Sequence, residues 1–272
     1  MADTVDVERQ VDRRPLEPIV VPFVPYYQDD RCTIYHADCL DVLPHLSGVA
    51  MCVTSPPYNQ LGSRMPDKPS GMHAETRWVS NTKTTCYADD MDEDDYEKWI
   101  AKVLRGCADA LRPGGSLFLN HKCRWREKRL LHPIDLVRGI ESLTLRQELI
   151  WCRAGSTTLN ARLFAPNAER IYWLIRDGGD WIWNQEAASW LSVWQISQDR
   201  SANGHPCPFP ATIPRRCIVA TTNEGDLVFE PFCGSGTTLR AAKDLGRRAI
   251  GCDLEERYCE MAAKRLEQGV LF

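Results

Sequence analysis

The sequence lacks any long hydrophobic run. None of its apolar stretches approaches the roughly 20 residues that a membrane-spanning helix requires. Residues 1–17 carry acidic side chains and lack the apolar segment of a signal peptide, so we expect a cytoplasmic protein with no membrane partner. The 272 residues, 43% of them hydrophobic, are enough to bury one large core. We predict a flexible tail over residues 1–24 and a single domain over residues 25–272.

The sequence also lacks the paired cysteines of a disulfide scaffold. Its 12 cysteines are scattered singly, and no two are spaced as Cys-x-x-Cys. We therefore expect reduced thiols, and we predict no metal site. Cys233 is expected to be a small buried side chain, as free cysteine usually is, rather than a nucleophile.

Two common phosphate-binding loops are absent. The segment 230–238 reads Glu-Pro-Phe-Cys-Gly-Ser-Gly-Thr-Thr, between a strand-like run and a helical pattern. A P-loop needs a lysine after its last glycine, where Thr237 stands, so ATPase chemistry is disfavoured. A dinucleotide loop needs a third glycine at position 239, where Leu239 stands, so a nicotinamide-dependent oxidoreductase is disfavoured as well.

What is present is a loop whose glycines allow the backbone to approach a ligand closely. Asp253 ends the next apolar run, residues 248–252. In a nucleotide-binding βαβ unit an acid at this place binds a ribose hydroxyl. Gly-x-Gly alone is a weak signal, but with the downstream acid it favours a cofactor that contains a nucleoside.

The tetrapeptide Ser55-Pro56-Pro57-Tyr58 ends another apolar run, residues 49–53. Two prolines remove two backbone donors and fix φ at about −65°, which leaves their carbonyls to meet a ligand. The Ser55 hydroxyl can accept from an N–H and the Tyr58 ring can stack, so the loop suits an exocyclic amino group on a flat heterocycle. The alternative is a proline turn that ends the strand, with Tyr58 in the core.

The two loops together resemble those of the S-adenosylmethionine-dependent DNA amino-methyltransferases. The resemblance implies methyl transfer to a base flipped out of double-stranded DNA, with Tyr58 stacking on the base while Ser55 Oγ and the Pro56 carbonyl accept its amino protons. It implies a catalytic loop made of Ser55, Pro56, Pro57 and Tyr58. It also implies S-adenosylmethionine as the cofactor, bound by Asp38, Glu230, Phe232, Gly234, Gly236, Thr237, Thr238 and Asp253.

Two of these cofactor residues have a second interpretation or depart from the family pattern. Asp38 precedes Leu40, Val42 and Leu43 in a helical pattern, so it is nearly as well explained as a helix N-cap. Many relatives have Asp-Pro-Phe where this chain has Glu-Pro-Phe. The longer side chain of Glu230 leaves its contact with the methionine amino group open.

Apolar and β-branched runs predict seven strands, near 32–36, 49–54, 115–120, 145–151, 170–176, 226–231 and 247–252. Helical spacing of apolar residues continues from Tyr96 to Leu111 and stops before Pro113, and further helices are expected near Thr237 and over 255–267. The predicted fold is α/β: a seven-stranded, mostly parallel, Rossmann-like methyltransferase sheet with helices on both faces.

The order of the loops predicts a circularly permuted sheet, because the catalytic loop precedes the cofactor loop. This order resembles the β class of the family. The strands that end at Ser55 and Glu230 would then lie side by side, with both loops at their carboxyl ends, where open α/β sheets bind ligands.

DNA contacts are harder to read, because the net charge is −4. A basic cluster over residues 122–129 is a candidate for phosphate contact, and the alternative is a solvated surface loop. Residues 154–205 are the expected target-recognition segment, and residues 60–88 a loop that closes on DNA. Trp181, Trp183, Trp190 and Trp194 are expected to form the small core of that segment. The candidate DNA-binding residues are Lys122, Arg124, Arg126, Arg162 and Arg170, with Asn167 and Arg200 as weaker candidates.

The target base and the partners stay open at this point. Among relatives, serine at the first loop position is associated mainly with cytosine-N4 methylation and aspartate with adenine-N6, so Ser55 favours cytosine-N4. Adenine-N6 is the alternative. RNA and protein-glutamine methyltransferases, which usually carry the two loops in the opposite order, and a catalytically silent DNA-binding protein are further alternatives. A homodimer and a cognate restriction nuclease are candidate partners.

Overall fold

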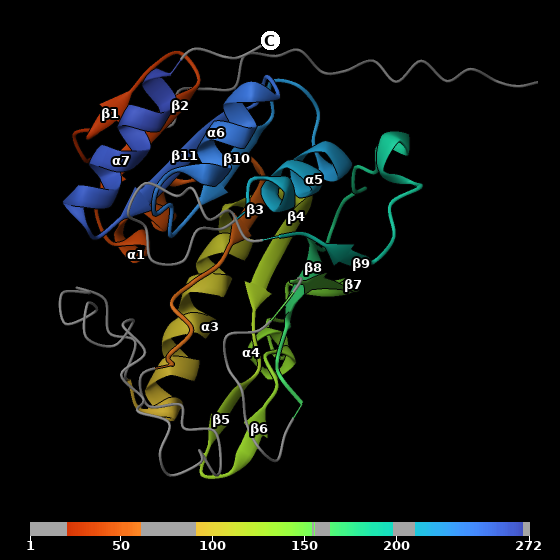
Figure 1. The fold of residues 1–272 in the computed structure, drawn as a ribbon. Helices are drawn as coiled ribbons and strands as arrows, with labels where there is room; N and C mark the ends of the chain where they lie inside the picture. The colour runs from red at the N-terminus through yellow and green to blue at the C-terminus, as the bar shows by residue number, and fades with distance from the viewer. Residues whose placement is uncertain (1–20, 61–90, 154, 156–163, 198–209, 269–272) are drawn as a thin grey trace, which may run out of the picture.

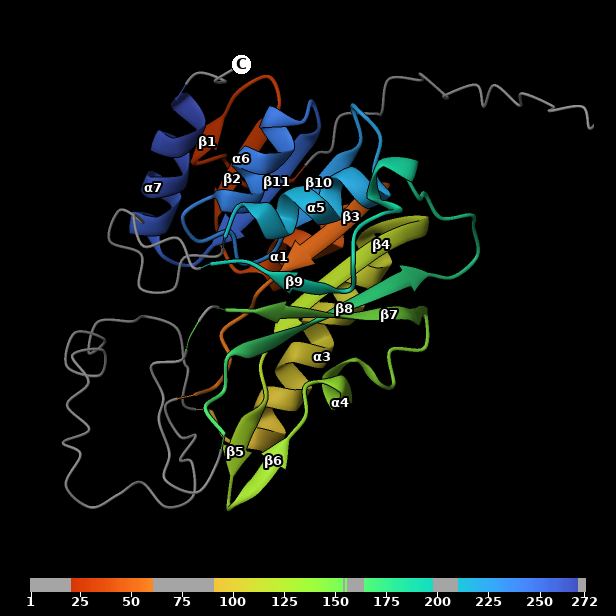
Figure 2. The same ribbon diagram turned by 45° about the vertical axis from the view of Figure 1, so that its right-hand side comes forward.

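The computed structural model describes residues 21–60, 91–153, 155, 164–197 and 210–268. Its centre is a nine-stranded sheet in the order β1-β2-β11-β10-β3-β4-β8-β7-β9 (Figures 1 and 2). The strands are β1 (Tyr27–Gln28), β2 (Cys32–His36), β3 (Val49–Thr54), β4 (Leu111–His121), β7 (Leu143–Cys152), β8 (Ala168–Arg176), β9 (Val193–Gln195), β10 (Leu227–Glu230) and β11 (Arg248–Asp253).

All seven predicted strands are present, and they form the body of the sheet. Strands β2, β11, β10, β3 and β4 run parallel, and β8 inserts antiparallel between β4 and β7. The predicted mostly parallel α/β sheet is therefore confirmed. Two short strands, β1 and β9, extend it at the edges.

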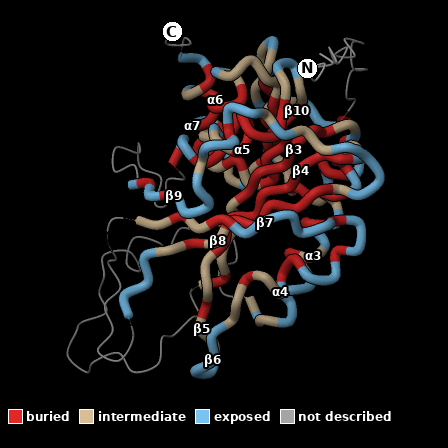
Figure 3. The backbone as a smooth tube through the Cα atoms, turned by 90° about the vertical axis from the view of Figure 1, so that its right-hand side faces the viewer, coloured by how far each residue is buried: buried red, intermediate tan, exposed pale blue. Residues whose placement is uncertain are grey.

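The side chains of each central strand alternate between two cores, as the period of two in a strand requires. On one face, Cys52, Leu117 and Phe229 pack with α1 (Cys39–Val42), the 3-10 turn η1 (Leu43–His45), α3 (Glu93–Ala110) and α4 (Ile134–Val137). On the other face, Met51, Phe118 and Val228 pack with α5 (Thr212–Thr221), α6 (Thr237–Asp244) and α7 (Glu256–Glu267). The predicted helices on both faces are thus observed, and Figure 3 shows the buried residues concentrated along the central strands.

Helix α3 begins where a cluster of acidic residues favours a helix N-terminus. The Asp92 side chain accepts from the Asp94 backbone N–H at 3.0 Å, and Glu93, Asp94 and Asp95 fill the first turn. Negative charge there is stabilised by the helix dipole. The helix ends at Ala110, before Pro113, as predicted.

Most of the basic cluster 122–129 lies in a hairpin over residues 124–131, and residues 127–130 at its end are exposed, as the alternative interpretation of a solvated surface expects. Its strands are β5 (Arg124–Arg126) and β6 (Arg129–Leu131), joined by Glu127 and Lys128. Both joining residues have positive φ, 47° and 65°, as a two-residue hairpin turn requires. The hairpin lies near the N-terminal end of α3 (Figure 2).

The predicted tail and the target-recognition segment are described in part. Val21 is buried against the first core, while residues 1–20 lie outside the described residues. In the segment 154–205, β8 belongs to the sheet, Trp194 is buried, and Trp181 and Trp183 pack on Trp173 at 5.5 and 5.4 Å between ring centroids. The 3-10 turn η2 (Gln185–Ala187) follows. The predicted closing loop 60–88 lies outside the described residues, Gln60 excepted.

No helix in the described parts of the chain is both long enough and apolar enough to cross a membrane. The ten cysteines in these parts are free thiols, and eight of them are buried.

Gly114 provides a test of the packing at the start of β4. Its φ is +76°, and a Cβ there would lie 2.0 Å from the backbone oxygen of Asp180. We expect Gly114→Ala to lower the free energy of unfolding by about 2–5 kcal/mol, of which about 1–2 is backbone strain and the rest overpacking. Gly139→Ala is the matched control, because Gly139 has a φ of +86° and open space around its Cβ position. Equal losses in urea unfolding of the two variants would contradict the packing argument.

Candidate active site

The two loops predicted to act together do lie on neighbouring strands. Val228 and Phe229 of β10 pair with Met51 and Cys52 of β3, so both strands deliver their loops to the same edge of the sheet. Strand β4 pairs with β3 on its other side, and β8 runs antiparallel to β4. The carboxyl end of β4 and the amino end of β8 therefore reach this edge as well.

The catalytic loop is anchored by a network of polar side chains. Tyr58 Oη lies 2.6 Å from Ser55 Oγ and donates to Glu169 Oε2 at 3.0 Å. Asn120 Nδ2 donates to Tyr58 Oη at 2.6 Å, to Glu169 Oε2 at 2.9 Å and, more weakly, to Ser55 Oγ at 3.3 Å. The network joins β4 and β8 to the loop and holds the two predicted side chains, Ser55 and Tyr58, against each other.

One face of the Tyr58 ring rests on His121, with ring centroids 4.4 Å apart, and Lys122 Nζ lies 5.8 Å from the ring centroid. Burial lowers the pKa of His121 to about 3, so its imidazole is neutral at physiological pH. The Tyr96 hydroxyl contacts both His121 Nε2 and the Pro57 carbonyl, each at 2.8 Å. The Pro57 carbonyl is therefore part of the support of the loop.

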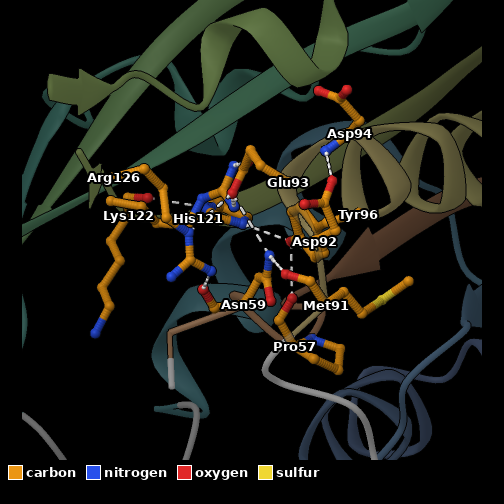
Figure 4. Close-up of polar contacts among 11 residues, drawn as sticks. Pro57, Asn59, Met91, Asp92, Glu93, Asp94, Tyr96, His121, Lys122 and Arg126 are labelled. Atoms are coloured by element: carbon orange, nitrogen blue, oxygen red, sulfur yellow. Dashed lines mark hydrogen bonds and ion pairs between the residues drawn. The ribbon is translucent and has the colours of Figure 1, made fainter. Parts of the chain in front are cut away.

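Asn59 continues this support beyond the tetrapeptide (Figure 4). It is fully buried with a φ of 53°, and its Nδ2 donates to the Met91 carbonyl at 3.0 Å. Arg126 donates to the Asn59 carbonyl at 2.7 Å. A left-handed conformation in a non-glycine residue costs free energy, and these bonds offset that cost.

The structure buries one of the candidate DNA-binding residues, Arg124, and partly buries another, Arg126. The Arg124 side chain is 3% exposed and forms an ion pair with Glu93 at 2.5 Å, and Arg126 contacts the same carboxylate at 3.3 Å. Arg124 also lies over the Tyr96 ring at 4.5 Å. Their guanidinium groups thus fix the hairpin to α3 and to Asn59, and we no longer assign Arg124 to phosphate contact.

Of the other candidate DNA-binding residues, some lie near the catalytic loop and some lie outside the described residues. Lys122 lies beside Tyr58, at the site. Arg170 follows Glu169 on β8 and contacts Glu148 at 3.3 Å. Arg162 and Arg200 lie outside the described residues, and the Asn167 backbone pairs with Arg153.

The cofactor loop turns sharply between β10 and α6. Gly234 and Gly236 have φ values of 49° and 75°. A Cβ on Gly236 would lie 2.7 Å from the Ala262 Cβ, so a larger residue would displace the loop from α7. Asp253 holds the loop from β11, since its carboxylate accepts from the Gly234 N–H and the Glu255 N–H, both at 2.9 Å.

Glu230 lies beneath the loop and is 4% exposed. Burial raises the pKa of Glu230 to about 8, although hydrogen bonds from Thr238 Oγ1 at 2.9 Å and the Phe232 N–H at 3.3 Å oppose this. Among the described residues no cation pairs with its carboxylate. A buried acid without a cationic partner at the end of β10 suits a ligand that carries an ammonium group, as S-adenosylmethionine does.

The remaining predicted cofactor residues have structural contacts of their own. Asp38 is the N-cap of α1 and accepts from the Leu40 N–H at 2.9 Å, so its alternative interpretation is observed. Thr237 Oγ1 accepts from Arg265, and Thr238 is engaged with Glu230. The Phe232 ring contacts Trp99 of α3 at 5.5 Å.

Most of the residues that support the catalytic loop were not among the predicted site residues. Asn120 ends a predicted strand and His121 follows it, at the edge of the sheet that carries Ser55, so their position in the sequence could have indicated a place in the site. Tyr96 and Trp99 were interpreted as the apolar side of a helix. Glu169 gave no signal, because its burial arises from the pairing of β8 with β4.

Comparisons with known proteins identify the family. The N6_N4_Mtase model, described as DNA methylase, matches residues 49–264, so the chain belongs to this family of DNA methylases. It is an S-adenosylmethionine-dependent DNA methyltransferase of the N6/N4 type.

Similar proteins match most of the chain. It is 25% identical over 266 residues to the type II methyltransferase M2.LlaDCHI of Lactococcus lactis subsp. cremoris, covering 91% of this chain and 94% of that protein. Its fold matches the cytosine-N4-specific PvuII DNA methyltransferase with a TM-score of 0.69 at 18% identity, over 91% and 90% of the two chains. It also matches M1.HpyAVI in its complex with SAM, with a TM-score of 0.61 at 21% identity, over 87% and 100%.

The raised pKa of Glu230 predicts a pH dependence of stability. The native state holds a proton that the unfolded chain releases near 4.5, so its contribution to stability is complete below pH 4.5 and is lost as pH rises through about 8. We expect Glu230→Gln to remove this pH-dependent contribution to the free energy of unfolding. Urea unfolding of both proteins at pH 5 and pH 9 measures it. Identical pH dependence in the two proteins would show that Glu230 does not titrate in this range.

Asp253 provides a test of the cofactor loop. We expect Asp253→Ala to weaken binding of S-adenosylhomocysteine about tenfold to a hundredfold, because hydrogen bonds to a charged group contribute about 1.5–3 kcal/mol. Calorimetric titration of the folded variant measures the affinity. Asp226→Ala is the control, since Asp226 pairs with Arg112 at the opposite end of β10 and its loss should leave affinity unchanged. Unchanged affinity in Asp253→Ala would remove this residue from the site.

Proposed function

We propose that this chain methylates the N4 amino group of a cytosine in double-stranded DNA, at a specific site. The observation that carries the proposal is the place of Ser55. It lies at the end of β3, next to the strand that carries the cofactor loop, and its neutral hydroxyl is held by Tyr58 and Asn120. The serine-type loop and the fold match with the cytosine-N4-specific PvuII enzyme both support N4 over N6.

The main task of the protein in this reaction is to align the amino group with the methyl group. Bound S-adenosylmethionine supplies an activated sulfonium methyl group, so the chain must hold an amino nitrogen in line with it. In this proposal Ser55 Oγ and the Pro56 carbonyl accept the two amino protons, which draws the nitrogen lone pair out of conjugation and towards the methyl group. The Glu230 carboxylate and Asp253 hold the ammonium and ribose ends of the cofactor.

The base must leave the helix to reach this loop, because its amino group is paired in a duplex. We assign Tyr58 to stacking on the flipped base, with the ring steadied by His121 on one face. Lys122 and Arg170 are the described candidates for contact with DNA. The β-class order of the two loops, the homodimer and the cognate nuclease remain predictions.

The product identifies the base. DNA methylated by the pure enzyme is digested to nucleosides, and we expect N4-methyldeoxycytidine by mass. N6-methyldeoxyadenosine as the sole product would overturn the cytosine assignment and support the N6 alternative, since adenine offers the same amino edge to the loop. RNA and protein substrates, offered in parallel with labelled cofactor, should take up no methyl groups.

A further inference from the structure

Glu169 is a buried carboxylate in the active site to which the proposed function gives no role. It lies near the start of β8 and is 5% exposed. Its Oε2 accepts from Tyr58 Oη at 3.0 Å and from Asn120 Nδ2 at 2.9 Å, and its Oε1 lies 3.6 Å from the Arg153 guanidinium. Burying a carboxylate beside a ligand loop is costly unless it is paired, so this arrangement needs an explanation.

The hydrogen bonds around Glu169 have a defined direction. An ionised carboxylate can only accept, so the Tyr58 hydroxyl proton points towards Glu169. The bond between Ser55 and Tyr58 must then be donated by Ser55, since the single Tyr58 proton is already used. Asn120 donates its amide protons into the same network. Ser55 Oγ is thereby left as an acceptor towards the substrate, which is the role that the amino group requires.

We propose that Glu169 is a positioning residue for methyl transfer, orienting Ser55 through Tyr58 and taking up the proton that the amino group loses. This inference rests on the proposed function. As the amino nitrogen bonds to the methyl carbon, the carbon–sulfur bond breaks and its electron pair stays on sulfur. The positive charge passes to the nitrogen. The nitrogen then gives a proton to Ser55 Oγ, Ser55 gives its own to Tyr58 Oη, and Tyr58 gives its own to Glu169, which becomes neutral and later releases the proton to water.

The charge on Glu169 explains how a serine-type loop acts without an acid of its own. A hydroxyl cannot balance a cationic nitrogen, whereas the carboxylate of Glu169, three hydrogen bonds from that nitrogen and only 5% exposed, can. Arg153 pairs with the other oxygen of this carboxylate, Oε1, at 3.6 Å, which offsets part of the cost of burying it.

Glu169→Gln tests the charge, because it keeps the size of the side chain. We expect the rate of methyl transfer in a single turnover to fall roughly 100-fold, the range of one acid–base group. Affinity for S-adenosylhomocysteine and for DNA should stay within about twofold of wild type, and Glu169→Asp should recover part of the rate. Glu148→Gln is the matched control, since Glu148 also pairs with an arginine on β8 but lies outside the network; its rate should be unchanged.

Tyr58→Phe tests the path, because it keeps the ring and removes the hydroxyl. If the proton passes through Tyr58, the double variant with Glu169→Gln should be no slower than the slower single variant. A single-turnover rate of Glu169→Gln within twofold of wild type would overturn the proposal. The proposal would also be overturned if the rate losses of the two single variants multiplied in the double variant. A loss of DNA or cofactor affinity in Glu169→Gln as large as its loss of rate would overturn it as well.

The same digests separate this inference from the proposed function. If wild type makes N6-methyldeoxyadenosine, the cytosine assignment fails while the comparison of rates still decides the role of Glu169. If wild type methylates no DNA, both fail. A normal wild-type product with an unaffected Glu169→Gln rate overturns this inference alone.

Discussion

Parallel pairing between β3 and β10 is the contact on which the active site depends. The two strands are far apart in the chain, yet their pairing places the catalytic and cofactor loops at one edge of the sheet. Strand pairing fixes register, and a shift of one residue would turn the side chains of β3 to the opposite core. Alignment of an amino group with a methyl group tolerates little error, so the loops are best supported by buried, fully paired strands.

The catalytic loop, residues 55–58, also needs support from side chains, because its two prolines have no backbone N–H to donate. Two successive prolines cannot pair with neighbouring strands, and the chain compensates with side chains from four elements. Tyr96 comes from α3, Asn120 and His121 from β4, Glu169 from β8 and Arg126 from β5. Together they contact the Pro57 and Asn59 carbonyls, the Ser55 and Tyr58 hydroxyls and the Tyr58 ring, which is how preorganised sites hold their reactive groups.

The sequence was most informative where the signal is local. The strands of the sheet body are continuous apolar runs, and the two loops have recognisable residues at fixed spacing, so the strands and the side-by-side placement of the loops were predicted correctly. Strands β1, β5, β6 and β9 contain two or three residues each, too few for a periodic pattern. Arg124 was assigned to DNA because a cluster of arginines suggests a surface, and its burial depends on Glu93 of a distant helix. The burial of Glu169 beside Tyr58 could not be predicted, because it depends on the pairing between β4 and β8 and no local sequence pattern shows that pairing.

The buried thiols have a consequence for how the cofactor half can be observed. Cys233 lies in the loop itself, Cys252 on β11 and Cys259 on α7, all buried, and burial raises the pKa of each thiol. A thiol reacts as its thiolate and where a reagent can reach it. We therefore expect these cysteines to be unreactive in the folded protein and to react when this region unfolds locally. The rate at which these thiols are alkylated therefore reports local opening of the loop between β10 and α6 and of the neighbouring β11 and α7.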